Sequence, residues 1–212
     1  MTTPDRPFIA YPHEVRAMLS GRQTQFRRVV KLREFQRSST PGYDWQFRGT
    51  RNGAPTKGTW QDFRHEQLLG ICPFGQPGDR LWVRETFYEL SSFEFFDDNV
   101  PDDIPSFLYH ADGEPTWGEW IKRPSIHMPR RASRLTLEVE NVRVERVQEI
   151  SEADARAEGC AAIGCGETAR CVPEPEWARD HFEELWNSTN GPNSWSDNPW
   201  VFAVNFRVVG AG

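Results

Sequence analysis

The 212-residue sequence predicts an α+β fold in which a small mixed β-sheet is flanked by about three short helices. Apolar residues alternate at strand spacing in four segments and recur at helical spacing in three others. Only 37% of the residues are apolar, but nine Trp and 14 Phe supply enough large side chains for one core. The length favours one core with insertions over two domains, so residues 1–212 are interpreted as a single domain.

The first elements are a helix and a strand separated by a glycine. Residues 12–19 (PHEVRAML) place Val15, Met18 and Leu19 on one helical face. Gly21 is suited to end this helix, because glycine readily adopts positive φ. Residues 24–31 then read as a strand.

The middle of the chain contains two expected insertions. Residues 32–62 carry Ser-Ser-Thr-Pro-Gly and Arg-Asn-Gly-Ala-Pro, which predict turns and loops. Pro77-Gly78-Asp79 predicts a turn into a strand at 80–86. The acidic stretch 89–118 is interpreted as a second insertion, with a short strand at 106–110.

The C-terminal half alternates strands and helices. Residues 134–147 predict a long half-buried strand that bends near Asn141, and Ser151 is suited to cap a helix. After an insertion at 160–173, an amphipathic helix is expected at 174–186. The alternation at 200–209 predicts the last strand.

The segment 18–30 carries the strongest functional signal. A glycine turn is followed by a strand that directs Arg27 and Arg28 to opposite faces. This layout suits an anionic or hydrogen-bonding ligand, such as a phosphate or a nucleobase edge. The alternative is ordinary surface charge on an edge strand.

Charge is segregated along the chain, although the net charge is −6. Residues 13–37 and 121–146 are rich in Lys and Arg, whereas residues 89–119 contain none. Two basic segments in an acidic chain predict a local anion site, not a surface that coats DNA.

The sequence predicts a cytoplasmic protein without a membrane partner. No apolar run reaches the length of a membrane span, and residues 1–20 lack a signal-peptide core. The cysteines are therefore expected to be reduced. Cys160, Cys165 and Cys171, with Cys72 as a distant fourth, lack the paired spacing of common zinc sites, so no metal or other cofactor is expected.

Five segments carry a resemblance to a known family: residues 21–28, 77–85, 123–129, 150–159 and 198–201. On these segments the chain resembles the ASCH domains of the PUA-like superfamily, and in particular a phage and prophage branch. The resemblance implies a PUA-like pseudo-barrel. It also implies recognition of RNA or a modified nucleotide, since family members are associated with that role.

Some bacterial members of this family hydrolyse the acetyl amide of 4-acetylcytidine. They use a Lys, a Thr and a Glu, whose positions correspond to Gln23, Phe26 and Glu158 in this chain. Gln cannot act as a base and Phe has no hydroxyl, so this activity is not expected here. Gln23 can instead hydrogen bond to a base edge, and Phe26 can stack on a base.

The expected site is a cationic cleft that binds a nucleic acid, a nucleotide or a modified nucleobase. Its expected members are Arg22, Gln23, Thr24, Phe26, Arg28, Arg84, Glu85, His127 and Arg130, with Glu158 as the tentative catalytic residue. Cationic neighbours are expected to keep Glu158 ionised. Two alternatives remain open: a hydrolase or nuclease with Glu158 as general base, and a phage structural or assembly protein.

Overall fold

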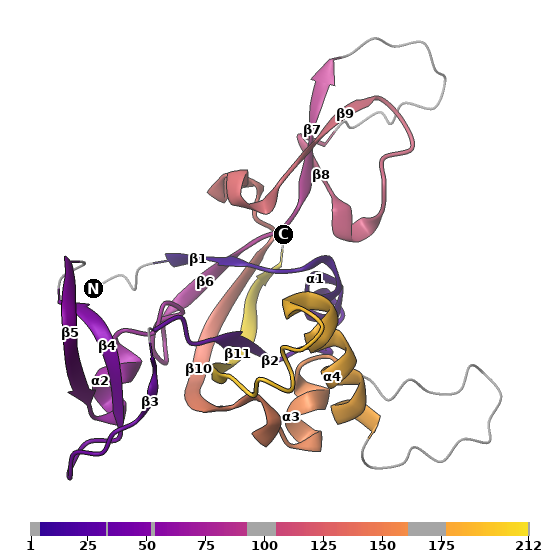
Figure 1. Ribbon diagram of the computed structural model, residues 1–212. Helices are drawn as coiled ribbons and strands as arrows, with labels where there is room; N and C mark the ends of the chain where they lie inside the picture. The colour runs from indigo at the N-terminus through magenta and orange to yellow at the C-terminus, as the bar shows by residue number, and fades with distance from the viewer. Residues whose placement is uncertain (1–4, 33, 52–53, 93–104, 161–176, 212) are drawn as a thin grey trace.

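The main body of the protein is a five-stranded mixed sheet. The computed structural model describes residues 5–32, 34–51, 54–92, 105–160 and 177–211 (Figure 1). The strand order is β1-β6-β10-β11-β2, with only the β1–β6 pair parallel. The strands are β1 (Asp5–Ile9), β2 (Gln25–Val29), β6 (Arg80–Arg84), β10 (Leu135–Arg146) and β11 (Trp200–Ala211).

The long β10–β11 pair forms the centre of this sheet. Leu135, Leu137 and Val139 are buried and alternate with more exposed residues, as the sequence predicts. The register shifts between Val139 and Asn141, which confirms the predicted bend. Such a bulge increases strand twist and helps the sheet to curl.

The curl brings the two edge strands of the sheet close together. The rings of Phe8 in β1 and Phe26 in β2 stack with centroids 4.3 Å apart. Arg28 Nη2 in β2 also donates to the Ile9 carbonyl in β1 across 3.2 Å. The two edges share no backbone pairing, so the described residues form an open barrel and not a closed one.

Three helices lie together on the β2 side of this sheet (Figure 1). They are α1 (Pro12–Leu19), α3 (Glu152–Ala157) and α4 (Trp177–Asn190). The Ser151 side chain accepts a hydrogen bond from Asp154 N, so the predicted cap is confirmed. Phe182 and Trp186 of α4 pack against Val147, Ile150 and Val201 in a second hydrophobic cluster.

A second sheet corrects the expectation of a loop at 32–62. It contains β3 (Gln36–Arg37), β4 (Trp45–Arg51) and β5 (Ala54–Phe63), and a further helix follows, α2 (His65–Gly70). Trp45 and Phe47 are two residues apart in β4, and both are buried. Trp45 contacts Trp200 of the body, and Phe47 stacks on Phe63. Packing of these aromatic residues outweighs the turn-forming residues around them.

The third sheet projects from the body (Figure 1). It contains β7 (Phe87–Ser92), β8 (Phe107–Tyr109) and β9 (Glu119–Arg123), and β8 confirms the short strand expected near 106–110. Arg134 joins this sheet to the body, because its guanidinium bonds both Glu85 and Asp112. Short 3-10 turns lie at His110–Asp112, Ser125–His127, Arg130–Ala132 and Val147–Glu149.

The expected insertion at 160–173 lies outside the described residues, apart from Cys160. The first residues of the expected helix at 174–186 also lie outside them, and α4 continues beyond its expected end to Asn190. In all, the described part of the chain has eleven strands in three sheets and four α-helices.

Candidate functional site

A small polar pocket lies where α1, β2, α3 and α4 meet. Its volume is about 40 Å³, room for a few water molecules or one small substituent. One side of the pocket carries four charged residues and one amide: Glu14, Arg27, Arg28, Glu158 and Gln23. Its remaining walls are Tyr11, His13, Phe182, Leu185, Trp186, Thr189 and Asn190.

Tight local packing positions Glu158 at this pocket. Glu158 ends α3, and Gly159 follows it with a φ of +85°. A Cβ atom on Gly159 would lie 3.0 Å from Ala17 Cβ, so this glycine allows α3 to approach α1 closely. Gln23 and Glu158 are paired as an antiparallel bridge.

Arg27 holds Glu158 through a buried charge network. The Arg27 side chain is fully buried, and its Nη1 donates to Glu158 Oε1 across 2.6 Å. The same guanidinium pairs with Glu145 and lies 3.5 Å from Asp154, which Arg143 also contacts. Three carboxylates therefore share two guanidinium groups.

The pKa of Glu158 differs from the expectation of an ionised group. Burial raises the pKa of Glu158 to about 7, and the opposing effect of Arg27 does not cancel this. The cationic neighbours are present, but desolvation outweighs them. The expectation that Glu158 stays ionised is therefore corrected. Near pH 7 its carboxyl group is present in both the protonated and the ionised form.

Several polar atoms around the pocket have no hydrogen-bond partner among the described residues. They are Gln23 Oε1, Arg27 Nε and Trp186 Nε1, which are all buried. Glu158 uses Oε1 to bind Arg27, and Oε2 accepts no hydrogen bond from any described residue. Buried polar groups are normally satisfied, so this cluster indicates an unfilled hydrogen-bonding requirement.

Arg28 joins the two edges of the open barrel. Its guanidinium binds both oxygens of Glu14, at 2.9 and 2.8 Å, and donates to the carbonyls of Ile9 and Arg27. Burial lowers the pKa of Arg28, but Glu14 outweighs it and the net shift is upward. Arg28 therefore reaches the pocket with its hydrogen-bonding capacity largely used within the fold.

Three other predicted residues of the 21–28 segment do not line the Glu158 pocket. Phe26 is fully buried and stacks on Phe8, so its ring has no free face for a base and the stacking expectation is corrected. Thr24 lies in a neighbouring groove and bonds Ala157 through its backbone. Arg22 is exposed, and its Nε donates to Ser20 Oγ.

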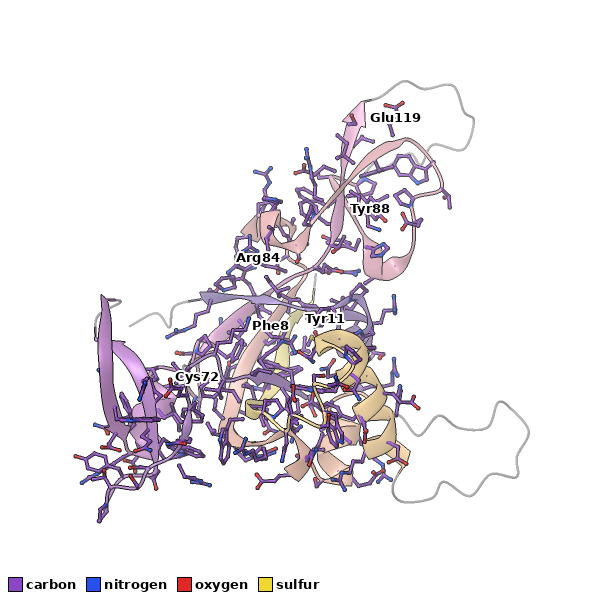
Figure 2. The ribbon with its side chains drawn as sticks, in the orientation of Figure 1. Phe8, Tyr11, Cys72, Arg84, Tyr88 and Glu119 are labelled. Carbon is purple, nitrogen blue, oxygen red and sulfur yellow. The ribbon has the colours of Figure 1, made fainter. Side chains whose placement is uncertain are left out.

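The other four predicted residues lie in a different place. Arg84 bonds the carbonyls of Ile126 and Met128, near the base of the projecting sheet, while Tyr11 lies towards α4 (Figure 2). The remaining three are Glu85, buried against Arg134; His127, exposed; and Arg130, paired with Asp5. None of the four lines the Glu158 pocket, so the structure does not form the single cleft that was expected to unite both groups.

A wide apolar groove of about 690 Å³ adjoins the polar pocket. It runs along the gap between β1 and β2 and shares Tyr11, Arg28 and Asn190 with the pocket. Its other lining residues are Pro7, Phe8, Ile9, Val29, Lys31, Leu32, Ile71, Pro73, Phe74 and Phe202.

Sequence reasoning missed several residues of this site. Glu14 occupies the third position of α1, where it also accepts a hydrogen bond from Tyr11 N, a capping role that can be recognised from sequence. Arg27 was noted as a charge but not as the partner of Glu158. The α4 residues were interpreted only as an apolar stripe.

Two of the four cysteines lie within the described residues. Cys72 and Cys160 are buried free thiols, and burial raises the pKa of Cys72 to about 11 and that of Cys160 to about 12. Cys165 and Cys171 lie outside the described residues. Within the described ranges, no three His, Cys, Asp or Glu side chains are grouped to hold a metal ion, and no helix is long and apolar enough to cross a membrane.

Comparison with known protein families, with curated proteins and with solved structures finds no match to this chain.

Proposed function

We propose that this protein recognises a nucleobase, free or in a nucleic acid, at the Glu158 pocket. The observation that carries the proposal is the set of polar atoms around the pocket that have no hydrogen-bond partner among the described residues. Glu158 Oε2 and Gln23 Oε1 can accept hydrogen bonds from N–H groups, and Trp186 Nε1 can donate one to a carbonyl. Base edges present both kinds of group.

The size of the pocket narrows the proposal to part of a base. A volume of about 40 Å³ admits a base edge or an exocyclic substituent, not a whole nucleotide. A site that hydrogen bonds a substituent discriminates against bases that lack it, because its buried polar atoms are then left unpaired. This supports recognition of a modified base.

The open barrel also supports the resemblance to PUA-like domains. A curled five-stranded sheet carries α1 and α3 beside β2, and the glycine turn at Gly21 leads into that strand. We propose on this basis that the fold is of the PUA-like type and the domain of the ASCH type.

A second candidate is a hydrolase or nuclease that uses Glu158 as general base. The observation that favours it is the pKa of Glu158, about 7, since a base that titrates near the working pH transfers protons efficiently. Gln23 and Phe26 stand where the amidohydrolases of the resembling family have a lysine and a threonine, so amide hydrolysis of 4-acetylcytidine is not expected.

A binding and turnover panel tests both candidates. Unmodified and modified nucleosides, 4-acetylcytidine among them, and short oligonucleotides are titrated by calorimetry and then analysed for products by chromatography. At pH 8, above the Glu158 pKa of about 7, Glu158→Gln is expected to weaken binding by about tenfold or more, because a hydrogen bond to a charged group contributes roughly 1.5–3 kcal/mol. Arg27 keeps Glu145 and Asp154 as partners, so the variant should stay folded.

Glu184→Gln is the matched control, since Glu184 is exposed on α4 and does not line the pocket. Equal affinity of wild type and Glu158→Gln for every bound probe would reject the recognition proposal. Product formation that is lost in Glu158→Gln would favour the hydrolase.

A further inference from the structure

The groove between β1 and β2 has the surface of a binding site for a flat apolar group. Phe8, Phe74 and Phe202 line it from three separate parts of the chain. Phe74 is half-buried and meets Phe8, Phe26 and Phe202 edge to face. Ile71 is 46% exposed on the groove wall. The volume of about 690 Å³ lies in the range of small-molecule sites.

One uncompensated positive charge lies on this otherwise apolar wall. Two cationic residues line the groove, Arg28 and Lys31. Arg28 is neutralised by Glu14. Lys31 is exposed, and its ammonium group has no ion pair or hydrogen bond with any described residue. An apolar surface with a single free cation complements an aromatic anion.

The groove and the polar pocket lie side by side. They share Tyr11, Arg28 and Asn190 on their walls. The polar pocket is too small for more than a base edge. The groove is therefore the neighbouring surface on which the rest of such a ligand can lie.

We infer that the groove is a subsite for the rest of a nucleotide, with the outer part of the base against its apolar wall and Lys31 binding the phosphate. The ligand class is therefore a nucleotide or a phosphorylated nucleic-acid end, and not a free nucleoside. The assignment to a nucleotide rests on the proposed function. The affinity of the groove for an aromatic anion does not, because Glu158 is absent from its lining.

The aromatic anion 8-anilinonaphthalene-1-sulfonate is a probe for this groove. Its fluorescence is titrated with the full chain, and AMP, CMP, GMP and UMP are then added as competitors, each beside its nucleoside. We expect saturable 1:1 binding that is displaced by at least one nucleotide and by none of the nucleosides.

Two variants with matched controls locate the probe. Lys31→Gln should weaken binding by about three- to fivefold, the effect of one exposed charge pair, and Ile71→Glu should abolish most of it by adding a negative charge to the wall. Lys122→Gln on β9 and Ile126→Glu, another exposed isoleucine, lie outside the groove and should change nothing. Each variant replaces an exposed residue, so folding is retained and is checked by circular dichroism.

The outcomes separate this inference from the proposed function. Binding that is insensitive to both groove variants, or displacement by nucleosides as readily as by nucleotides, would overturn the inference. Failure of all four nucleotides to displace the probe would overturn the nucleotide assignment. Probe binding is judged from Lys31→Gln and Ile71→Glu alone, and neither residue lines the Glu158 pocket, so a failure of the pocket proposal would not be mistaken for a failure of the groove.

Discussion

At the residue scale, the decisive group is the carboxyl of Glu158. It shares the Arg27 guanidinium with Glu145 and Asp154, and those two carboxylates also pair with Arg143. Because the acids outnumber the bases and the site is buried, one carboxyl group can stay protonated at modest cost. The open pocket gives that proton a route to a ligand.

The raised pKa of Glu158 predicts a dependence of stability on pH. The unfolded carboxyl group loses its proton near pH 4.5, whereas the folded one keeps it to about pH 7. In that window the folded protein binds more protons, so this group makes the free energy of unfolding fall as the pH rises. Urea unfolding of wild type and Glu158→Gln between pH 4.5 and 8 measures this pH dependence of the free energy of unfolding.

The difference between wild type and Glu158→Gln is the informative quantity. The pKa of His13 is lowered, mainly by burial, and that of Glu85 is raised by burial, so both contribute in or near the same window. They are present in both proteins and cancel in the difference. A difference that is flat from pH 4.5 to 8 would contradict the protonated state of Glu158.

The residue scale is also where sequence reasoning was least complete. Glu158, Gln23 and Arg28 were identified, and all three line one pocket. The raised pKa of Glu158 and the burial of the Phe26 ring were not predicted. Both depend on contacts between residues far apart in the chain. Charge near a carboxyl group is visible in a sequence, but the loss of water around it is not.

At the element scale, the open edges of the barrel need protection. Ala10 N donates to Arg84 O, so in the parallel pair Pro7 and Ile9 direct their backbone groups away from β6. Pro7 has no N–H, and the Ile9 carbonyl is bound by Arg28. An edge blunted in this way resists pairing with another strand. This favours a ligand over a peptide strand in the groove.

Arg28 is therefore predicted to stabilise the whole body. Arg28→Gln leaves Glu14, 7% exposed in its side chain, as an unpaired carboxylate and should lower the free energy of unfolding by about 3 kcal/mol. Adding Glu14→Gln should recover part of this loss. Denaturant titration of the single and double variants measures the coupling.

Arg130→Gln is the matched control for this prediction. Its pair with Asp5 is exposed, with side-chain exposures of 46% and 39%, so the loss should be below about 1 kcal/mol. Equal effects of Arg28→Gln and Arg130→Gln would show that Arg28 does not join the edges.

The elements of the body follow from the sequence better than those around it. The periodicity of α1, β10 and β11 is strong, and the structure confirms these elements. The β3–β4–β5 sheet was missed because β4 and β5 are interrupted by glycine and proline. What stabilises that sheet is contact of Trp45 with Trp200, a partner 155 positions further along the chain, which no local pattern indicates.

At the scale of the whole molecule, part of the basic charge is paired with acidic side chains. Arg123 pairs with Glu89, Arg130 with Asp5 and Arg6 with Asp79, while Arg80 and Arg207 share Glu138. Segregation along the chain is thus partly undone by folding, because acidic segments pack beside basic ones. Strong non-specific binding of DNA is not expected.

Binding of oligonucleotides should accordingly show a shallow dependence on salt. Few phosphates are neutralised, so a plot of log affinity against log salt should have a slope of about −2 to −4. Lys31→Gln, at the exposed lysine of the groove, should reduce the slope by about one, because this residue is proposed to bind a phosphate. Fluorescence anisotropy with labelled single strands between 50 and 300 mM salt would be the measurement.

Arg80→Gln provides the comparison, because Arg80 is exposed but already lies 3.8 Å from Glu138. Its replacement should leave the slope unchanged, since Arg80 lines neither the pocket nor the groove. A slope steeper than about −6 in the wild type would mean a broad phosphate-binding surface, and equal effects of the Lys31 and Arg80 variants would mean that the contact is not localised. Either result would contradict recognition through one small pocket and its adjoining groove.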